Sequence, residues 1–165
     1  MNETATSTAS TVRQDIRREL DDTRTAYHEL VRGLNDSQWN APSGNPGWTC
    51  GQLAWHIAET GKFVSGLVAN ARKGKGTNPP GFLLPLAFKA NEFLVRRKSR
   101  NATRDSVIAD FDANVARLTS ELDSVQDDQF TMSATNFGEK RTIRQMFSIV
   151  TEHFGEHGPQ IRNAP

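Results

Sequence analysis

The sequence predicts an all-α protein folded as a four-helix bundle, with a long crossover connection between the second and third long helices. Four segments carry apolar residues at helical spacing along one face. No segment alternates convincingly between apolar and polar residues, the nearest being the short FTMSA at residues 130–134. At 165 residues the chain suits one domain, which we expect to span residues 11–165 behind a flexible polar tail at residues 1–10.

The first long helix is expected from about residue 11 to residue 33. Its apolar residues fall at helical spacing: Val12, Ile16, Leu20, Tyr27, Leu30, Val31 and Leu34. Gly33 and the polar residues after it end the helix, and the segment NAPSGNPGW is a loop because it is dense in Pro, Gly, Ser and Asn. His28 lies off the apolar stripe, so we expect it at the surface.

The second long helix is expected from Thr49 to about Arg72. Thr49 and Gln52 form a capping box, in which each side chain accepts a hydrogen bond from the other residue's backbone N–H. The apolar stripe of this helix contains Leu53, Ile57, Phe63 and Val64, and it also contains His56. An imidazole within an apolar face needs an explanation, since polar side chains are buried only with a partner.

The crossover contains an apolar run and a basic run. After the loop GKGTNPPG comes FLLPLAF at residues 82–88, and a short helix is predicted over residues 88–97. The apolar run could roof a pocket or form a dimer interface. The basic run RRKSR at residues 96–100 could bind the carboxylates of a thiol cofactor or an anionic substrate, or it could be a solvated helix end.

The two remaining helices are expected from about residue 104 to 125 and from Thr142 onward, separated by the polar loop DDQFTMSATNFGEK. Thr142 and Gln145 form a second capping box. The inward residues are Val107, Phe111, Val115, Leu118 and Leu122 on the third helix, and Ile143, Met146, Phe147, Val150, Phe154 and Ile161 on the last.

Composition argues against several classes of protein. The net charge of +1 gives no sign of nucleic-acid binding, and the longest apolar run is too short to cross a bilayer. The N-terminal sequence has no signal-peptide pattern, and Cys50 is the only cysteine, so an intrachain disulfide is impossible. We therefore expect a cytoplasmic protein that acts on a small molecule rather than on a membrane.

Three of the four histidines fall on inward faces. His153 and His157 are four residues apart, so both imidazoles lie on one side of the last helix, close enough to share a metal ion. His56 would complete a three-nitrogen site with an open position for water or substrate. The spacing alone equally allows hydrogen-bonded core histidines without metal.

Two motifs resemble those of the DinB/YfiT-like superfamily. GWTCGQLAWHIAE at residues 47–59 is similar to its second-helix motif, and HFGEHGPQI at residues 153–161 is similar to its closing motif. The resemblance implies a four-helix bundle with a long crossover, and a divalent metal, often zinc or nickel, on His56, His153 and His157. It also implies that homodimers are common, and that relatives include transferases and isomerases that use low-molecular-weight thiols, besides some hydrolases.

The sequence departs from the family motif after its last histidine. Relatives often carry a basic residue there, whereas Gly158 and Pro159 follow here, and Pro159 cannot donate to the carbonyl of Gly155. We therefore expect the last helix to kink or fray just beyond the histidines. Such a change would shift His157 and would affect metal affinity more than the fold.

Other side chains near the motifs have weaker functional claims. Glu59 could orient an imidazole or act as a base, while Glu152 and Glu156 are more typical of solvated helix residues. Cys50, in the first turn of its helix, could be a nucleophile with a lowered pKa, although we interpret it as a packing residue.

Three functions stay open at this stage. The first is a metal-dependent thiol S-transferase, or a related enzyme such as a hydrolase, acting on small electrophiles. The second is a non-catalytic, stress-related or interacting bundle that binds metal. The third is a metal-free bundle that binds a small ligand, suggested by Gly158 and Pro159 beside the last histidine.

Overall fold

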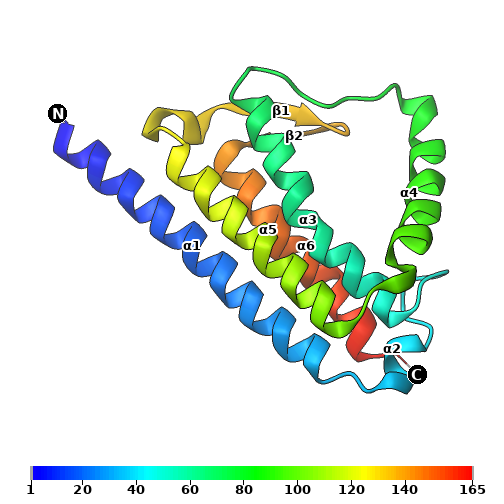
Figure 1. Ribbon diagram of the computed structural model, residues 1–165. Coiled ribbons are helices and arrows are strands. Elements are labelled where there is room, and N and C mark those ends of the chain that lie inside the picture. Colours follow the sequence, from blue (N-terminus) through cyan, green and yellow to red (C-terminus); the bar gives the residue numbers. More distant parts are fainter. Residues whose placement is uncertain (1, 165) are drawn as a thin grey trace.

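Four long helices form the body of the protein (Figure 1). The computed structural model describes the backbone of residues 2–164 and the side chains of residues 11–83, 85–86 and 89–164. The long helices are α1 (Asn2–Arg32), α3 (Cys50–Ala71), α5 (Arg104–Ser124) and α6 (Ile143–Arg162). α1 packs against both α5 and α6, and α3 packs against the same two helices. The predicted four-helix bundle with a crossover between its second and third long helices is confirmed.

Shorter elements connect the long helices. They are α2 (Asp36–Asn40), α4 (Leu84–Lys98), β1 (Ser133–Asn136), β2 (Glu139–Thr142) and three 3₁₀ turns at Gly81–Leu83, Ser99–Asn101 and Asp127–Thr131. The expected helix in the crossover is present as α4, which begins four residues earlier than expected, with Pro85 in its first turn. α1 likewise begins well before residue 11, within the segment expected to be a tail.

The prediction of a wholly irregular loop between the last two long helices was wrong. β1 and β2 pair as an antiparallel hairpin, with Ser133 opposite Thr142 and Asn136 opposite Glu139. Each strand has only four residues, too few for a readable alternation of apolar and polar side chains. The hairpin is tied to the crossover, because the backbone N–H of Phe137 donates to the carbonyl of Thr77 at 2.8 Å.

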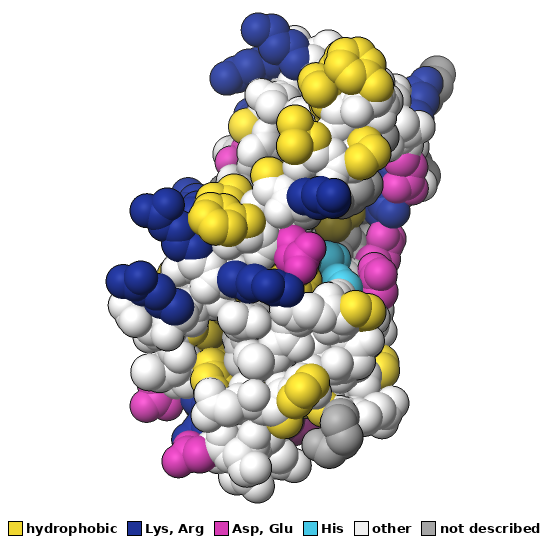
Figure 2. Space-filling view, turned by 90° about the vertical axis from the view of Figure 1, so that its right-hand side faces the viewer, with side chains coloured by type: hydrophobic (Ala, Val, Ile, Leu, Met, Phe, Trp, Pro, Cys, Tyr) yellow, Lys and Arg dark blue, Asp and Glu magenta, His cyan; other side chains and the backbone are white. Residues whose placement is uncertain are grey.

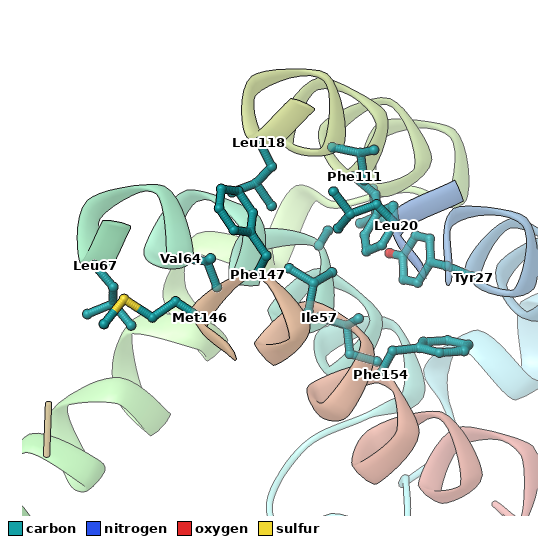
Figure 3. Close-up of a cluster of buried hydrophobic side chains, with 14 of the residues drawn as sticks. Leu20, Tyr27, Ile57, Val64, Leu67, Phe111, Leu118, Met146, Phe147 and Phe154 are labelled. Carbon is teal, nitrogen blue, oxygen red and sulfur yellow. The ribbon is translucent and has the colours of Figure 1, made fainter. Parts of the chain in front are cut away.

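The core lies where the four long helices meet (Figure 3). Leu20 and Tyr27 of α1, Ile57 and Val64 of α3, and Phe147 of α6 all point toward one another and are almost fully buried. The ring of Tyr27 stacks on Phe111 of α5 with centroids 4.2 Å apart, and its hydroxyl donates to the carbonyl of Ala54 at 2.9 Å. One side chain of α1 therefore contacts two other helices and leaves no buried hydroxyl unpaired.

Both predicted capping boxes are present. The Gln52 backbone N–H donates to Thr49 Oγ1 at 3.2 Å, and Gln52 Oε1 accepts from the Thr49 N–H at 3.0 Å. Thr142 and Gln145 make the same reciprocal pair at the start of α6. These caps fix the residues at which α3 and α6 begin. The starting residue determines which side of each helix carries the histidines.

The expected fraying of the last helix just beyond His157 was wrong, because α6 continues through Pro159 to Arg162. Pro159 and Gly155 both lie on the exposed side of α6, where water can hydrogen-bond to the Gly155 carbonyl that lacks an intrahelical donor. Beyond Pro159 the last turn is held by Ile161, which is buried, and by the Gly44 N–H, which donates to the Gln160 carbonyl at 2.8 Å.

A close contact between α3 and α5 gives a stability prediction. A Cβ atom at Gly61 would lie 2.9 Å from Asn114 Cβ, so Gly61→Ala is expected to lower the free energy of unfolding by about 1–3 kcal/mol. Gly66, on the same helix, is the matched control: a Cβ there would have no heavy atom of the described residues within 4 Å. Gly66→Ala is expected to stabilise by about 0.5–1 kcal/mol. Urea unfolding of both variants tests this, and equal effects would contradict the close contact.

Over the residues that the structure describes, none of the helices is both long enough and apolar enough to cross a bilayer.

Candidate metal centre

The packing of α3 against α6 brings three histidines together. His56 is on the second turn of α3, and His153 and His157 are one turn apart on α6. One nitrogen from each imidazole lies within 4.8 Å of the nitrogens of the other two. The helical spacing explains the pairing of His153 with His157, whereas the contact with His56 depends on how the two helices pack.

The distances between the histidine nitrogens can be compared with those around one bound zinc ion. Nε2 of His56 and Nε2 of His153 are 3.0 Å apart, and the ring centroids of His153 and His157 are 4.4 Å apart. Nitrogens at about 2 Å from a tetrahedral zinc ion lie roughly 3.3 Å from one another. The nitrogens of His56 and His153 are close to this separation, and the set of three spans 4.8 Å, so the imidazoles would move closer together on binding one cation.

Burial keeps two of these imidazoles neutral. Desolvation, and then the charge of His157, lowers the pKa of His56 to about 4. Desolvation, and then the charges of His56 and His157, lowers the pKa of His153 to about 3. Neutral imidazole is the form that binds a metal, and an imidazolium here would be both desolvated and repelled. The site is therefore ready to accept a cation near neutral pH without first losing protons from these two rings.

Two neighbouring side chains, Gln160 and Trp48, contact the histidines. Nδ1 of His157 lies 2.9 Å from Gln160 Oε1; since the amide oxygen only accepts, Nδ1 donates, which leaves Nε2 of His157 with its lone pair free. Trp48 is buried with its ring centroid 4.8 Å from that of His56, and its Nε1 has no hydrogen-bond partner among the described residues. Our sequence interpretation assigned no role to either residue, although the i, i+3 spacing of His157 and Gln160 could have suggested their contact.

Gln160 gives a test of this arrangement. Gln160→Ala is expected to weaken zinc binding by about 10–100-fold, because His157 loses the acceptor that fixes its tautomer and ring orientation. Gln160→Glu keeps an acceptor at the same place and should retain or strengthen binding. Isothermal titration with zinc compares the two, and equal weakening by both variants would contradict a role for the Nδ1 hydrogen bond.

The structure does not connect the glutamates near the motifs with the three histidines. Glu59 is about a third exposed, with its carboxylate 3.9 Å from Lys62 Nζ, and Glu152 pairs with Arg141 at 2.6 Å. Glu156 is exposed. Among the described residues, none of the carboxylates is hydrogen-bonded to His56, His153 or His157.

Two other sequence expectations can be compared with the structure. Cys50 is fully buried, and burial raises the pKa of its thiol, which supports a packing role and opposes an activated nucleophile. His28 was expected at the surface, but its side chain is only 15% exposed and its Nε2 lies 2.7 Å from Asp112 Oδ1. The expectation failed because the imidazole reaches across from α1 to a carboxylate on α5.

The crossover presents its apolar and basic residues to solvent. Phe82 is 81% exposed and Leu86 65% exposed, and Arg96 forms an exposed ion pair with Glu92 at 2.7 Å. Figure 2 shows histidine atoms reaching the surface between acidic side chains, with hydrophobic side chains elsewhere on the same face. The histidines are thus accessible from one side of the molecule.

Comparisons with known proteins agree with this architecture. A sequence model of the DinB superfamily matches residues 19–161. A search of the curated proteins finds no match. Among solved structures, a mycothiol-dependent maleylpyruvate isomerase is similar with a TM-score of 0.70 and 15% identity, covering 92% of this chain and 61% of that one. YfiT from Bacillus subtilis, described as a probable metal-dependent hydrolase with an unusual four-helix bundle topology, has a TM-score of 0.69 and 17% identity, covering 91% of this chain and 83% of that one.

A third similar structure is an uncharacterised protein from Clostridium difficile 630, with a TM-score of 0.67 and 12% identity over 91% of this chain and 93% of that one. At these identities the likeness concerns the fold. The chain spans about three-fifths of the length of the maleylpyruvate isomerase.

Proposed function

Because the chain belongs to the DinB superfamily and brings three imidazoles to one point, we propose that it binds a divalent metal through His56, His153 and His157 and acts as a thiol S-transferase on small electrophiles. The observation that carries this proposal is the convergence of the three ligand nitrogens within 4.8 Å. Zinc or nickel fits three imidazole nitrogens.

The chemistry needs little from the protein beyond the site itself. When bound by His56, His153 and His157, a divalent cation would lower the pKa of a thiol beside it, so that the thiol would react as a thiolate. His56 and His153 supply neutral nitrogens, and Gln160 fixes the ring of His157. The thiolate sulfur forms a bond to the electrophilic carbon, the leaving group departs with the bonding electrons, and the thiol proton passes to solvent.

Hydrolysis is the second candidate, supported by the description of YfiT as a probable metal-dependent hydrolase. Thiol transfer is the better fit, because a thiolate needs no general base, and no carboxylate is hydrogen-bonded to the three histidines within the described part of the chain. The mycothiol dependence of the similar isomerase also supports a low-molecular-weight thiol as the second substrate.

The remaining parts of the proposal concern assembly and location. We propose a homodimer, supported by the exposed apolar side chains Phe82, Leu86 and Phe93 on and before α4. We propose a cytoplasmic location, where low-molecular-weight thiols stay reduced.

The proposed activity is tested by loading the protein with zinc or nickel and mixing it with 1-chloro-2,4-dinitrobenzene and a panel of cysteine, glutathione and mycothiol. Thioether formation should require metal and should fall to the uncatalysed rate in His153→Ala. His28→Ala is the matched control, since His28 pairs with Asp112 rather than with the other histidines. Metal-loaded protein that turns over none of these thiols, yet hydrolyses ester or amide substrates, would favour the hydrolase instead.

A further inference from the structure

A small cleft lies beside the β-hairpin, between the second half of α3 and the beginning of α6. Its volume is about 200 Å³, and its walls are mainly apolar, with Phe63, Leu67, Phe137 and Ile149 among them. A dry cavity of roughly 150 Å³ is large enough to hold benzene. This hairpin cleft therefore has room for one ring or a branched alkyl group.

The hairpin cleft and the three histidines are both formed by residues of α3 and α6. Phe63 follows His56 by seven residues on α3, which is two helical turns or about 10 Å along the axis. Ile149 precedes His153 by four residues on α6, about 6 Å along the axis. A molecule with its apolar end in the cleft could thus place a reactive carbon near the histidines.

Phe137 occupies the hairpin turn in a strained conformation. It has φ of +52°, Gly138 follows with φ of +87°, and the two residues join strands paired through Asn136 and Glu139. Such a turn favours Asn followed by Gly, and a bulky aromatic residue with positive φ is a rare outlier. The side chain gains little burial in return, since Phe137 is 47% exposed, as is Phe63, whose ring centroid lies 6.0 Å away. The backbone of Phe137 is thus strained, and its ring gains little burial to offset the strain. This combination indicates that the ring has a role other than stabilising the fold.

A residue in the wall of the cleft, Asn136, carries an unpaired hydrogen-bond donor. Asn136 is 8% exposed, and its Oδ1 accepts from the Thr77 N–H at 2.8 Å, which fixes the orientation of the amide. Its Nδ2 is buried with no partner among the described residues. A buried donor without an acceptor is costly, so a movement that brought a ligand oxygen to Nδ2 would be favoured.

The charges at the cleft disfavour an anion. Arg141 is the cationic side chain in its wall, and both Glu139 and Glu152 pair with it, at 2.9 Å and 2.6 Å. Two carboxylates around one guanidinium leave a surplus of negative charge. A ligand without negative charge therefore fits, and the apolar walls favour a neutral one over a cation.

We propose that the hairpin cleft binds the apolar part of the electrophilic substrate, a neutral compound with an aromatic or branched alkyl group and a carbonyl-type acceptor, and that Phe63 and Phe137 hold this group between them. This assignment deepens the proposed function and rests on it. It makes Phe137 a residue that determines substrate specificity and explains why the turn carries Phe instead of Asn.

The test uses acetophenone, a neutral ring with one carbonyl, and benzoate, its anionic counterpart of similar size. Titrations of the metal-free protein, followed by the amide NMR signals of residues 63, 136–138 and 149, should show acetophenone binding at the cleft and benzoate binding at least about tenfold more weakly. Phe137→Asn should weaken acetophenone binding at least about fivefold, since an aromatic contact is lost, while the melting temperature stays unchanged or rises. Leu94→Asn, at an exposed apolar residue of α4 outside the cleft, is the control and should bind acetophenone as the wild type does.

The outcomes separate this proposal from the proposed function. Unchanged acetophenone binding in Phe137→Asn, or equal binding of benzoate, would overturn the assignment of the cleft, whatever the metal content of the protein. Failure of the wild type to bind metal would overturn the proposed function and leave the metal-free titration unaffected. In the metal-loaded protein, Phe137→Asn should raise KM for 1-chloro-2,4-dinitrobenzene with bound metal unchanged, and an unaltered KM would also count against the cleft.

Discussion

Replacing His153 with Ala is expected to reduce bound metal from about one ion per chain to a trace. His153 is the central ligand, because its ring centroid lies 4.8 Å from that of His56 and 4.4 Å from that of His157. Its loss leaves two nitrogens on different helices, which is too few for a stable site. Since loss of a mere supporting partner costs 10–100-fold in affinity, loss of a ligand should cost more than about 100-fold.

The measurement is metal content after zinc or nickel loading and gel filtration, together with the melting temperature with and without metal. Metal that binds only the folded chain should stabilise the wild type by roughly 3 kcal/mol at a free concentration 100 times Kd. This stabilisation should vanish in His153→Ala and persist in His28→Ala, whose imidazole pairs with Asp112. Stoichiometric zinc in His153→Ala would place the ligands elsewhere, and a metal-free wild type after loading would make the three histidines core residues.

From the sequence, the arrangement of site residues could be predicted only where those residues lie on one helix. The i, i+4 spacing of His153 and His157 determines that they share a face, and the capping boxes fix where each helix begins. That His56 lies 3.0 Å from His153 depends on the packing of α3 on α6, and the sequence indicated only that His56 faces inward, with the family resemblance as further support. The i, i+3 spacing of His157 and Gln160 allowed a contact between them, and the side-chain positions show that it is made.

The fold was predictable where long periodic segments pack, and less so at its periphery. The hairpin lacks the Asn-Gly turn by which such a turn is usually detected, because Phe137 stands at its first position. Phe63 falls on the apolar stripe of α3, yet it is 47% exposed, because it lies on the wall of the hairpin cleft rather than inside the bundle. Both Phe137 and Phe63 lie on the wall of the cleft, where local preferences and the final structure disagree.

Lowering the pH is expected to destabilise the metal-free protein through the same histidines. The folded chain holds the pKa of His56 at about 4 and that of His153 at about 3, both below the usual 6.5. The unfolded chain therefore binds more protons below pH 6.5, and stability falls with pH in that range. The stabilisation is present in full above about pH 6.5 and is lost progressively as the pH falls through 4 toward 3. Between about pH 7 and pH 5 the loss should approach roughly 2 kcal/mol for each histidine.

Urea unfolding of the chelator-treated protein across this range measures the loss, and His153→Gln should remove about half of it because glutamine does not titrate. Titration of the Asp112 carboxyl does not contribute between pH 7 and pH 5. Desolvation raises its pKa, but hydrogen bonds from Arg24 and His28 outweigh this effect and hold the pKa below 3.8, so its contribution to the free energy of unfolding disappears only at lower pH. A slope that is the same in His153→Gln and the wild type would mean that the imidazoles are already protonated in the folded chain. Added zinc should steepen the slope in the wild type, because protons and metal compete for the same nitrogens, and this linkage connects the acid sensitivity of the fold to occupancy of the site.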